Sequence, residues 1–389
     1  MQRTKKLYYD SSMLCQFSSE VLDCTPKGDH WLVVLAATAF YPEGGGQPAD
    51  HGRLGNAQVL DVHEKEGVIF HTTNQPLSVG TTVEGEIYWQ RRLDLMQQHT
   101  GEHILSGLLH NMFGAENVGF HIGQELVTMD MNIPLSEQQL LQAETAANQL
   151  IWKNIAVECS FPSAQELEQL DYRSKKEIQG QVRIVTIPQG DCCACCGTHL
   201  PYTGMVGQIK LLDWQNYKGG TRLTVACGGR ALADYRIKRQ QLAQMGAMFS
   251  LPANQAAQGA QKLQQQLEQT KAQLAALQNV WFDAVAEKIC PDQSPIMFVE
   301  GLSRDGLRSL CLRLCERTPL PCGVFSSKEQ GFGYAIGQKD GNITALTKAI
   351  NQIFGGKGGG KPFLTMGSLQ ATQQKIEHFW NTYKEDTTP

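Results

Sequence analysis

The sequence contains no long hydrophobic run. No stretch approaches the roughly 18 apolar residues that a membrane-spanning helix requires. The first ten residues carry Arg3, Lys5 and Lys6, but the apolar segment of a secretory signal peptide does not follow them. We therefore expect a cytoplasmic protein that does not contact a membrane.

The chain also lacks a strong charge of either sign. Its 34 Lys and Arg residues against 38 Asp and Glu residues give a formal net charge of −4, and 41% of its residues are hydrophobic. This composition is that of an ordinary globular protein, and it neither indicates nor excludes a nucleic-acid partner. At 389 residues the chain is long enough for several domains, each with its own core.

Two pairs of metal-binding residue types repeat one spacing. His99 and His103 are four residues apart in an apolar pattern typical of a helix, so both imidazoles face the same way. Cys195 and His199, in the cysteine-rich run 191–199, are also four apart. Three imidazoles and one thiolate suit Zn²⁺, and the twelve cysteines of a cytoplasmic protein stay reduced. We expect these four residues to bind one zinc ion per chain.

The cysteine ligand has alternatives. Cys192 forms a Cys-x-x-Cys pattern with Cys195, and Cys196 is its immediate neighbour. The matched spacing to His199 favours Cys195, but replacement by Cys192 or Cys196 stays open. If all four ligands bind, zinc has no free position for water and only orients the substrate. If His199 is held loosely, a zinc-bound hydroxide becomes the alternative.

The same two histidines allow a second interpretation. His99-Thr-Gly-Glu-His103 matches the inverted zinc-peptidase signature H-x-x-E-H, in which Glu102 would be the general base. Such peptidases take a downstream carboxylate as a further ligand, whereas here a Cys/His pair completes the set. A metallopeptidase is therefore the weaker alternative.

Residues 1–90 are expected to form a small β-barrel. Short strand-like segments separated by Gly, Pro, Asn and Asp are typical of such a fold. Among them lies the sequence Gly44-Gly45-Gly46-Gln47. Three glycines alone are typical of a hairpin loop, but Gln47 and Asp50 beside them favour the wall of a site. The expected strands are 31–36, 57–62, 67–71 and 83–88.

Residues 91–230 are expected to form a mixed α/β core. The metal helix comes first, and a second helix over 135–154 has Ser136 as its N-cap. The remaining expected elements are a strand over 183–187 that leads into a cysteine-rich turn, and strands over 206–212 and 221–226 joined by a turn containing Lys218.

Residues 231–288 are expected to form a helical, coiled-coil-like connector, which Pro252 divides into two helices. The second helix carries a heptad seam that a second chain or the preceding helix could cover, and the sequence does not decide between them. A homodimer through this connector or the C-terminal domain is therefore one alternative. The seam consists of Leu263, Leu267, Thr270, Leu274, Leu277 and Trp281.

Residues 289–389 are expected to form a small α/β domain, with strands near 296–300, 322–326 and 333–336 and helices near 304–317, 344–354 and 369–383. Between the last two helices lies the glycine-rich run Gly355–Pro362. We expect a loop that binds phosphate through its backbone N–H groups and the N-terminus of the next helix. The run lacks the Gly-Lys-Ser/Thr ending of a nucleotide P-loop, so the sequence favours a nucleic-acid backbone over ATP. A flexible linker is the alternative.

Four motifs occur in the order found in alanyl-tRNA editing proteins: Gly44–Pro48, His99 with His103, Cys195–His199, and Thr203-Gly204. The chain resembles the long form of the AlaX family, freestanding relatives of the alanyl-tRNA synthetase editing domain. Its Gly355–Pro362 run resembles the DHH-associated domain that ends that synthetase. The resemblance implies an α+β multidomain protein with a barrel, an editing core, a helical connector and a C-terminal tRNA-contacting domain.

The resemblance also implies an activity. The chain would be an ATP-independent aminoacyl-tRNA deacylase that removes serine or glycine from mischarged tRNA(Ala) and spares the alanyl ester. The threonyl-type editing domain shares both metal pairs, but the Gly44–Pro48 loop and the C-terminal domain favour the alanyl system. A non-catalytic, zinc-stabilised tRNA-binding protein is an alternative of another class.

The candidate site residues follow from the same resemblance and from residue chemistry. Cys196 stands where the synthetase usually has Gly, and Glu102 stands at a variable position. The candidate catalytic residues are Gln47, Thr100 and Glu102, of which Gln47 and Thr100 could recognise the serine hydroxyl. The metal ligands are His99, His103, Cys195 and His199. The candidates for substrate binding are Gly44, Gly45, Gly46, Gln47, Thr198 and Arg230. The candidates for tRNA binding are Lys357, Gly358, Gly359, Gly360 and Lys361.

Overall fold

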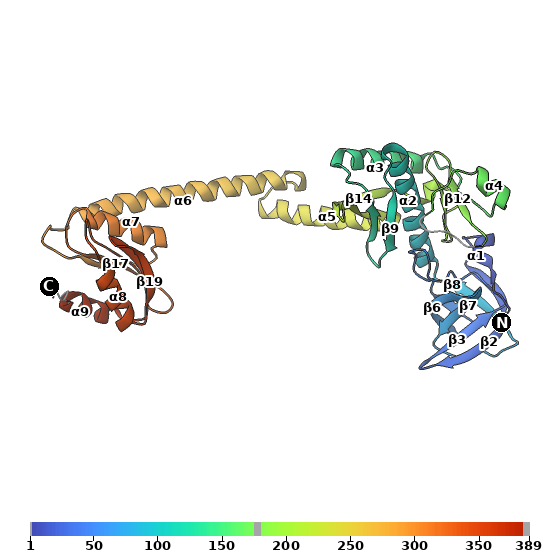
Figure 1. Cartoon of the computed structure of the whole chain (residues 1–389), viewed down its shortest axis with the longest axis horizontal. Helices are drawn as coiled ribbons and strands as arrows, with labels where there is room; N and C mark the ends of the chain where they lie inside the picture. The colour runs from blue at the N-terminus through green and yellow to red at the C-terminus, as the bar shows by residue number, and fades with distance from the viewer. Residues whose placement is uncertain (1, 175–179, 384–389) are drawn as a thin grey trace. The chain divides into compact units, whose positions relative to one another are not determined.

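The computed structural model describes residues 2–174 and 180–383. The chain divides into two compact units, Met1–Leu242 and Ala243–Pro389, whose elements can be followed by colour in Figure 1. Both units combine helices with sheets, which confirms the α+β multidomain class. Within the described ranges, every helix is too short or too polar to cross a membrane.

The N-terminal unit begins with strands that pair in a closed barrel in the order β2-β3-β7-β6-β5-β8. Alternate residues of β2 point inward, as its exposed-buried pattern over Gln16–Val21 shows. The sequence analysis missed β2, because polar residues and Pro26 interrupt its apolar alternation. The strands are β2 (Gln16–Lys27), β3 (His30–Leu35), β5 (Gly52–Leu54), β6 (Ala57–Lys65), β7 (Val68–Thr73) and β8 (Thr82–Ile87), preceded or interrupted by β1 (Lys5–Lys6), α1 (Leu7–Asp10) and β4 (Ala37–Thr38).

The helix that carries both histidines follows the barrel. This helix, α2 (Trp89–Phe113), ends at Gly114, whose φ of 67° gives the left-handed cap that favours glycine. The helix α3 (Glu137–Trp152) begins as predicted, with Ser136 and Gln139 forming a capping box. Both helices contribute to one hydrophobic core with the sheet β14-β15-β10-β9. Its strands are β9 (Asn117–Ile122), β10 (Val127–Met131), β14 (Ile209–Tyr217) and β15 (Gly220–Cys227).

The cysteine-rich run corrects the sequence prediction of a turn. Its first half is the strand β13 (Asp191–Ala194), which pairs with β12 (Ile184–Ile187) in the sheet β11-β12-β13. Alternation in β13 buries Asp191 and Cys193 and turns their neighbours outward. A further correction concerns Val206, which ends the 3₁₀ helix η1 (Thr203–Val206) instead of opening a strand. The same region contains β11 (Glu158–Ser160) and α4 (Ala164–Gln169).

A buried ion pair joins the barrel to α2. The Arg92 side chain is fully buried and donates to both carboxylate oxygens of Asp50, with Nε 3.0 Å from each. Its other nitrogens donate to the carbonyls of Ser12 and Ala39 at 2.8 and 2.6 Å. Asp50 in turn accepts the backbone N–H of Tyr41 at 2.6 Å. These bonds fix one face of α2 against the barrel wall.

Pro252 ends the helical pattern where predicted. The helix α5 (Gly228–Met248) precedes it, and α6 (Ala256–Ala286) follows after the short 3₁₀ helix η2 (Ala253–Gln255). The predicted heptad seam of α6 is exposed in the described chain, for example by 52% at Leu267 and 69% at Leu277.

The C-terminal unit contains the sheet β16-β17-β18-β20-β19. The helix α7 contributes to the core on one face, whereas α8 and α9 contribute to the core on the other. The elements are β16 (Ile296–Phe298), α7 (Arg304–Cys315), β17 (Cys322–Ser327), β18 (Phe332–Gly337), α8 (Thr344–Ile353), β19 (Lys357–Lys361), β20 (Leu364–Leu369) and α9 (Gln373–Thr382).

The glycine-rich run is a strand, which corrects the prediction of a loop before a helix. Lys357–Lys361 forms β19, which pairs antiparallel with β20 and so lies at the edge of the sheet. Glycine is depleted in strands, so the run suggested a loop. Because β20 follows β19, no helix N-terminus stands directly after these glycines, and the expected phosphate cradle of loop and helix end is wrong.

We predict that Arg92→Met destabilises the N-terminal unit by about 3–5 kcal/mol, because it leaves the Asp50 carboxylate buried without its partner. The measurement is urea unfolding followed by circular dichroism. Arg53→Met on the exposed side of β5 is the control and should cost under about 0.5 kcal/mol. Equal costs for the two variants would contradict the role of the buried pair.

His71 predicts a pH dependence of stability. It is fully buried in the barrel, with Nδ1 3.1 Å from the Val33 carbonyl and Nε2 2.8 Å from the Thr38 hydroxyl. Burial lowers its pKa from 6.5 to about 4. At a pH between 4 and 6.5 His71 is protonated in the unfolded chain but neutral in the folded one. The contribution of neutral His71 to the free energy of unfolding is therefore complete above pH 6.5 and is lost as the pH falls toward 4.

The expected loss is about 3 kcal/mol from this residue. It is measured as the difference in urea unfolding free energy between wild type and His71→Gln across this pH range. The variant should show a shallower decline with falling pH. Parallel profiles would contradict the assignment.

Candidate metal centre

Four metal-binding side chains from two distant segments meet in one cluster. His99 and His103 come from α2, and Cys195 and His199 come from the irregular segment after β13. One donor atom of each residue lies within 4.8 Å of the others. The three histidines are at most 2% exposed. The structure thus assembles the four residues that the sequence analysis grouped.

The spacing of the donors fits zinc. Cys195 Sγ lies 3.4 Å from Nε2 of His99 and 3.4 Å from Nε2 of His199. Tetrahedral zinc with its usual Zn–S and Zn–N bond lengths would separate such donors by about 3.6 Å. Three imidazoles and a thiolate are also a donor set that zinc favours. We conclude that the residues present fit a zinc ion.

Two of the imidazoles are oriented by outer partners. His99 Nδ1 lies 2.7 Å from Gln47 Oε1, and His103 Nδ1 lies 2.7 Å from Asp191 Oδ2. Since an oxygen acceptor at Nδ1 fixes the N–H there, Nε2 is left as the lone-pair nitrogen that faces the other donors. This is the outer arrangement that metal-binding histidines normally have.

His199 is held differently. Its Nδ1 is buried and has no hydrogen-bond partner within the described ranges. Its backbone carbonyl accepts the Ser12 hydroxyl at 2.7 Å, so the turn between α1 and β2 positions this residue through the main chain. Outer hydrogen bonds therefore fix the rings of His99 and His103 more firmly than the ring of His199.

Sequence reasoning missed the outer residues Asp191 and Arg173. Asp191 is buried, and its second oxygen accepts Arg173 Nε at 2.9 Å. Arg173 also donates to the Ser106 hydroxyl at 2.8 Å. The one available signal was the position of Asp191 directly before the cysteines, since 88 residues separate it from His103.

The Gly44–Gln47 sequence is both a hairpin turn and part of the site. Gly44 and Gln47 pair across the turn, and Gly45 and Gly46 have φ values of 60° and 83°. The turn delivers a fully buried amide to the metal centre. Gln47 Nε2 donates to the Thr198 hydroxyl at 2.8 Å, while Oε1 accepts the Thr198 N–H at 3.2 Å and faces His99. Both ends of the amide are therefore engaged by protein.

Two glycines allow close approach around His99. A Cβ at Gly197 would lie 2.1 Å from His99 Cε1, and a Cβ at Gly46 would lie 2.7 Å from the Phe120 carbonyl. The Phe120 ring stacks on the His99 imidazole with a centroid distance of 5.2 Å. A side chain at Gly197 would displace the His99 ring itself, and one at Gly46 would displace Phe120, which stacks on that ring.

The other predicted residues take different positions. Glu102 is buried beside the donors, with Oε2 3.9 Å from His103 Nε2 and Oε1 accepting from Asn117. The Thr100 hydroxyl accepts the N–H of Leu200 at 3.0 Å and so ties α2 to the second ligand segment.

Arg230 is engaged elsewhere. It forms a bidentate pair with Asp94 at 2.9 and 2.7 Å and donates to the Gly123 carbonyl at 2.9 Å. These bonds anchor the start of α5 on α2. The guanidinium of Arg230 thus bonds Asp94 and Gly123 and not the four metal-binding residues.

The neighbouring cysteines lie outside the cluster of four donors. Cys192 faces the Thr186 hydroxyl at 3.8 Å, and Cys196 is exposed, with its carbonyl accepting the Tyr9 hydroxyl at 3.2 Å. Cys193 belongs to a second group with His103 and Asp191. The geometry thus favours Cys195 over Cys192 and Cys196 as the thiolate.

The electrostatics favour the ionisation states that a metal requires at Cys195 and His199, but they favour the protonated form of His103. Burial acts to raise the pKa of Cys195, but His99 and His199 outweigh it and hold that pKa well below the usual value. Burial and the nearby His99 lower the pKa of His199 to about 3, so its ring is neutral at neutral pH. Burial also acts against a charged His103, but Cys195 and Asp191 raise its pKa well above the usual value. A metal would therefore displace a proton from His103.

Two parts of the chain match families of aminoacyl-tRNA synthetase domains. Residues 182–224 match the family described as threonyl and alanyl tRNA synthetase second additional domain. Residues 2–91 match the family described as tRNA synthetases class II (A). The chain is thus related to the aminoacyl-tRNA synthetases of this class.

The similar whole proteins are alanine–tRNA ligases. The ligase of Pyrococcus abyssi is 31% identical over 97% of this chain and 43% of its own length, and that of Pyrococcus furiosus is 30% identical over 96% and 43%. The chain therefore spans less than half the length of these curated relatives. The matches confirm that it is related to the editing and C-terminal domains of alanyl-tRNA synthetase.

A solved structure also aligns with part of the chain. The C-Ala domain of Aquifex aeolicus alanyl-tRNA synthetase covers 24% of this chain and 91% of its own, at 21% identity and a TM-score of 0.22. A TM-score this low does not establish a shared fold.

We predict that the purified protein holds about one zinc per chain, and that Cys195→Ser removes it, since the fourth donor is lost. Elemental analysis by mass spectrometry measures the content after dialysis against a weak chelator. Cys192→Ser is the matched control and should keep its zinc. Zinc lost from Cys192→Ser but retained by Cys195→Ser would overturn the ligand assignment.

Proposed function

We propose that the chain is a zinc-dependent aminoacyl-tRNA deacylase that hydrolyses tRNA(Ala) mischarged with serine or glycine. The observation that carries the proposal is the buried cluster of three histidines and one cysteine, bounded by the Gly44–Gln47 turn. The relatives are named alanine–tRNA ligases, and this name supports tRNA(Ala) as the partner. An ester is already activated, so a positioned water and a stabilised oxyanion suffice for its hydrolysis.

In this proposal His99, His103, Cys195 and His199 would hold zinc, which would supply a positive charge at the aminoacyl group. Gln47 and Asp191 are positioning residues, because each fixes the ring of one donor histidine. The Glu102 carboxylate is the group next to the cluster that can accept the proton of the attacking water. The water oxygen then bonds to the ester carbon, and the tRNA ribose oxygen leaves with a proton.

Thr198 is the best candidate for reading the serine hydroxyl. Its Oγ1 accepts from Gln47 and still has its own hydrogen to donate. Gln47 itself has both amide ends engaged. The Thr100 hydroxyl accepts from Leu200 and also keeps its own hydrogen, but Thr198 is preferred because it bonds the amide of the Gly44–Gln47 turn. A site that hydrogen-bonds a hydroxyl discriminates strongly against an amino acid that lacks it. Thr198 would therefore favour the seryl ester over the alanyl ester.

The domains take separate roles in this proposal. Residues 1–90 and 91–230 form the editing part, 231–288 connect, and 289–389 contact tRNA. Exposed residues of β19, at the edge of its sheet, would meet tRNA phosphates. The exposed seam of α6 would support a homodimer. The proposed tRNA-contacting residues are Lys357, Gly358, Gly359, Gly360 and Lys361.

The second candidate function is a zinc-stabilised protein that binds tRNA without catalysis. Four protein donors would complete a tetrahedral zinc sphere, as in structural zinc sites, and would leave no open position for water. The peptidase interpretation has less support, since a thiolate takes the place of the expected carboxylate ligand.

We predict that the zinc-loaded protein deacylates Ser-tRNA(Ala) or Gly-tRNA(Ala) and leaves Ala-tRNA(Ala) intact. Cys195→Ala should lower the rate at least about 100-fold, because it removes a ligand that organises the site. Release of labelled amino acid measures the rate. Cys192→Ala, outside the cluster, is the control and should stay within about twofold of wild type.

The two candidate functions give opposite results in this assay. Failure of the zinc-loaded protein to hydrolyse any of the three esters, with tRNA binding retained, would reject the deacylase and favour the binding protein.

Thr198→Ala should reduce seryl deacylation more than glycyl deacylation. Equal losses would reject its role in reading the hydroxyl.

A further inference from the structure

Three cysteines that belong to no metal-binding group come together in the C-terminal unit. Cys311 and Cys315 are one turn apart on α7, and Cys322 is the first residue of β17. Gly337, the last residue of β18, pairs with Cys322 across the sheet. A Cβ at Gly337 would lie 2.9 Å from Cys315 Sγ and 3.1 Å from Cys311 Sγ. The absence of a side chain at Gly337 therefore lets both helical thiols reach the strand pair that carries Cys322.

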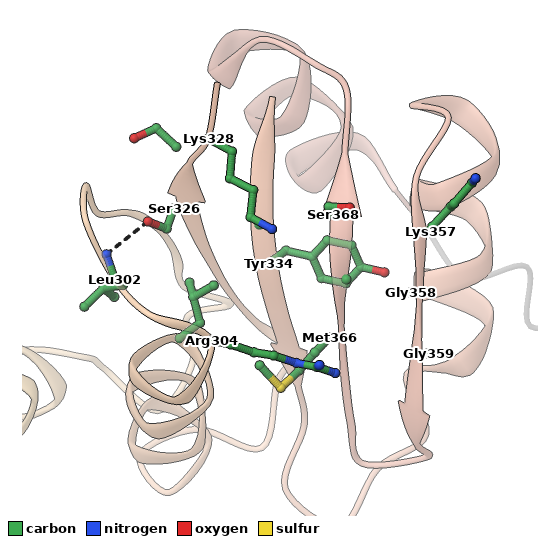
Figure 2. Close-up of a pocket in the computed structure, with 14 residues that line it drawn as sticks. Leu302, Arg304, Ser326, Lys328, Tyr334, Lys357, Gly358, Gly359, Met366 and Ser368 are labelled. Carbon is green, nitrogen blue, oxygen red and sulfur yellow. Dashed lines mark hydrogen bonds between the residues drawn. The ribbon is translucent and has the colours of Figure 1, made fainter. Parts of the chain in front are cut away.

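Two contacts hold α7 over this part of the sheet. Just before the helix begins, the Leu302 N–H donates to the Ser326 hydroxyl of β17 at 3.2 Å, as Figure 2 shows. Further along the helix, the Cys311 thiol donates to the Cys322 carbonyl at 3.6 Å. These contacts keep the helical thiols close to the start of β17.

Only one of the three thiols borders a hollow at the C-terminal end of α7. The hollow has a volume of about 620 Å³, and its lining includes Cys315, Leu312 and Phe363. Cys311 and Cys322 are fully buried and do not line it, whereas Cys315 is 5% exposed. A small reagent that enters from solvent would therefore meet Cys315 first.

Hydrogen bonds make Cys315 the most readily ionised thiol of the three. The thiols of Cys311 and Cys322 donate to Cys315, and these bonds lower its pKa below the usual value although burial acts against them. The contact with Cys315 raises the pKa of Cys311 and that of Cys322. The thiolate, and not the thiol, is the nucleophile in reactions with oxidants. Cys315 therefore combines access from the hollow with the reactive form.

The geometry favours Cys322 over Cys311 as the partner of Cys315 in a disulfide. Residues four apart on a helix have Cβ atoms about 5–6 Å apart, whereas a disulfide needs about 3.5–4.5 Å. A bridge between Cys311 and Cys315 would thus distort α7. Cys322 lies on another element and already hydrogen-bonds Cys315, so the helix does not oppose this pairing. All three cysteines are reduced in the structure.

We propose that Cys315 is a thiol that reacts with hydrogen peroxide, and that Cys322 converts its oxidised form to a disulfide. The Cys315 thiolate attacks one peroxide oxygen, an S–O bond forms, the O–O bond breaks, and the hydroxide that leaves takes up a proton to become water. The Cys322 thiol then attacks the sulfur of this sulfenic acid. An S–S bond forms, the S–O bond breaks, and the oxygen leaves as water with the Cys322 proton.

This site is independent of the metal centre. The two thiols are oxidised by two electrons in total, and the peroxide that receives them is the only co-reactant. The inference goes beyond the proposed deacylation and does not rest on it, because every residue involved belongs to the unit Ala243–Pro389.

The test treats the full-length, zinc-loaded protein with hydrogen peroxide and maps its cysteines by tryptic digestion and mass spectrometry. Trypsin places Cys311, Cys315 and Cys322 on three peptides, because one arginine stands between each neighbouring pair. The expected product is a disulfide between Cys315 and Cys322 that dithiothreitol reverses. Cys315 should be oxidised at least about tenfold faster than Cys290, an exposed cysteine of the same unit.

Four variants assign the roles of the thiols. Cys315→Ala should abolish the disulfide, and Cys322→Ala should leave Cys315 as a sulfenic acid that dimedone traps. Cys311→Ala should still form the disulfide. Cys290→Ala is the matched control and should form it at a rate within about twofold of wild type.

Three results would overturn the inference. They are the absence of the disulfide, a bridge from Cys315 to Cys311 in its place, and oxidation of Cys290 as fast as that of Cys315. Circular dichroism checks that the variants are folded. The comparison of Cys315 with Cys290 is made within the wild-type protein, so it does not depend on the folding of any variant.

Discussion

The metal centre depends on a fixed contact between the barrel and α2, and a buried ion pair supplies it. Arg92 lies seven residues before His99, two helical turns away, so the two side chains project from the same face of α2. Asp50 closes the pair from the barrel, three residues after Gln47, which bonds His99. One short barrel segment thus both locks the helix and orients a metal donor. Movement of α2 against the barrel would disturb both contacts at once.

The protein orients its four donors unequally. Gln47 and Asp191 hold the rings of the two helical histidines, whereas His199 is held through its carbonyl and Ser12. A ring with an external acceptor resists rotation, because rotation would leave a buried polar group unpaired. Among the residues that the structure describes, none bonds the Nδ1 atom of His199. If zinc is bound, His199 would therefore be the donor that the protein restrains least.

Local patterns predicted much of the site, because their physical cause is local. The spacing of His99 and His103 is a helical spacing, and the capping box at Ser136 is a contact over three residues. The second pair was grouped by the same spacing, although Cys195 and His199 lie in an irregular segment that needs glycine at position 197. For Cys195 and His199 the prediction rested on their being metal-binding residue types, because the argument from helical spacing does not apply outside a helix.

What the sequence could not predict depends on distant partners. Asp191 acts on His103 across 88 residues, and nothing in the local sequence records this pairing. The strand β19 consists mostly of glycine and is a strand only because β20 pairs with it. In both places the tertiary partner, and not local preference, decides the structure.

Glycine-rich sequence has two different consequences in this chain. At Gly44–Gln47 positive φ values make a turn tight enough to deliver one amide to the metal centre. On the C-terminal sheet the absence of a side chain at Gly333 leaves room for the Lys328 side chain.

The metal centre and the C-terminal sheet lie in separate units of one continuous chain. A tRNA held by the C-terminal unit would remain at a high effective concentration near the metal centre. The only condition is that one tRNA can reach both units. In the proposed function the division therefore lets affinity come from one unit and chemistry from the other. The editing site can then bind the aminoacyl group weakly, which leaves more of its interactions for discrimination between serine, glycine and alanine.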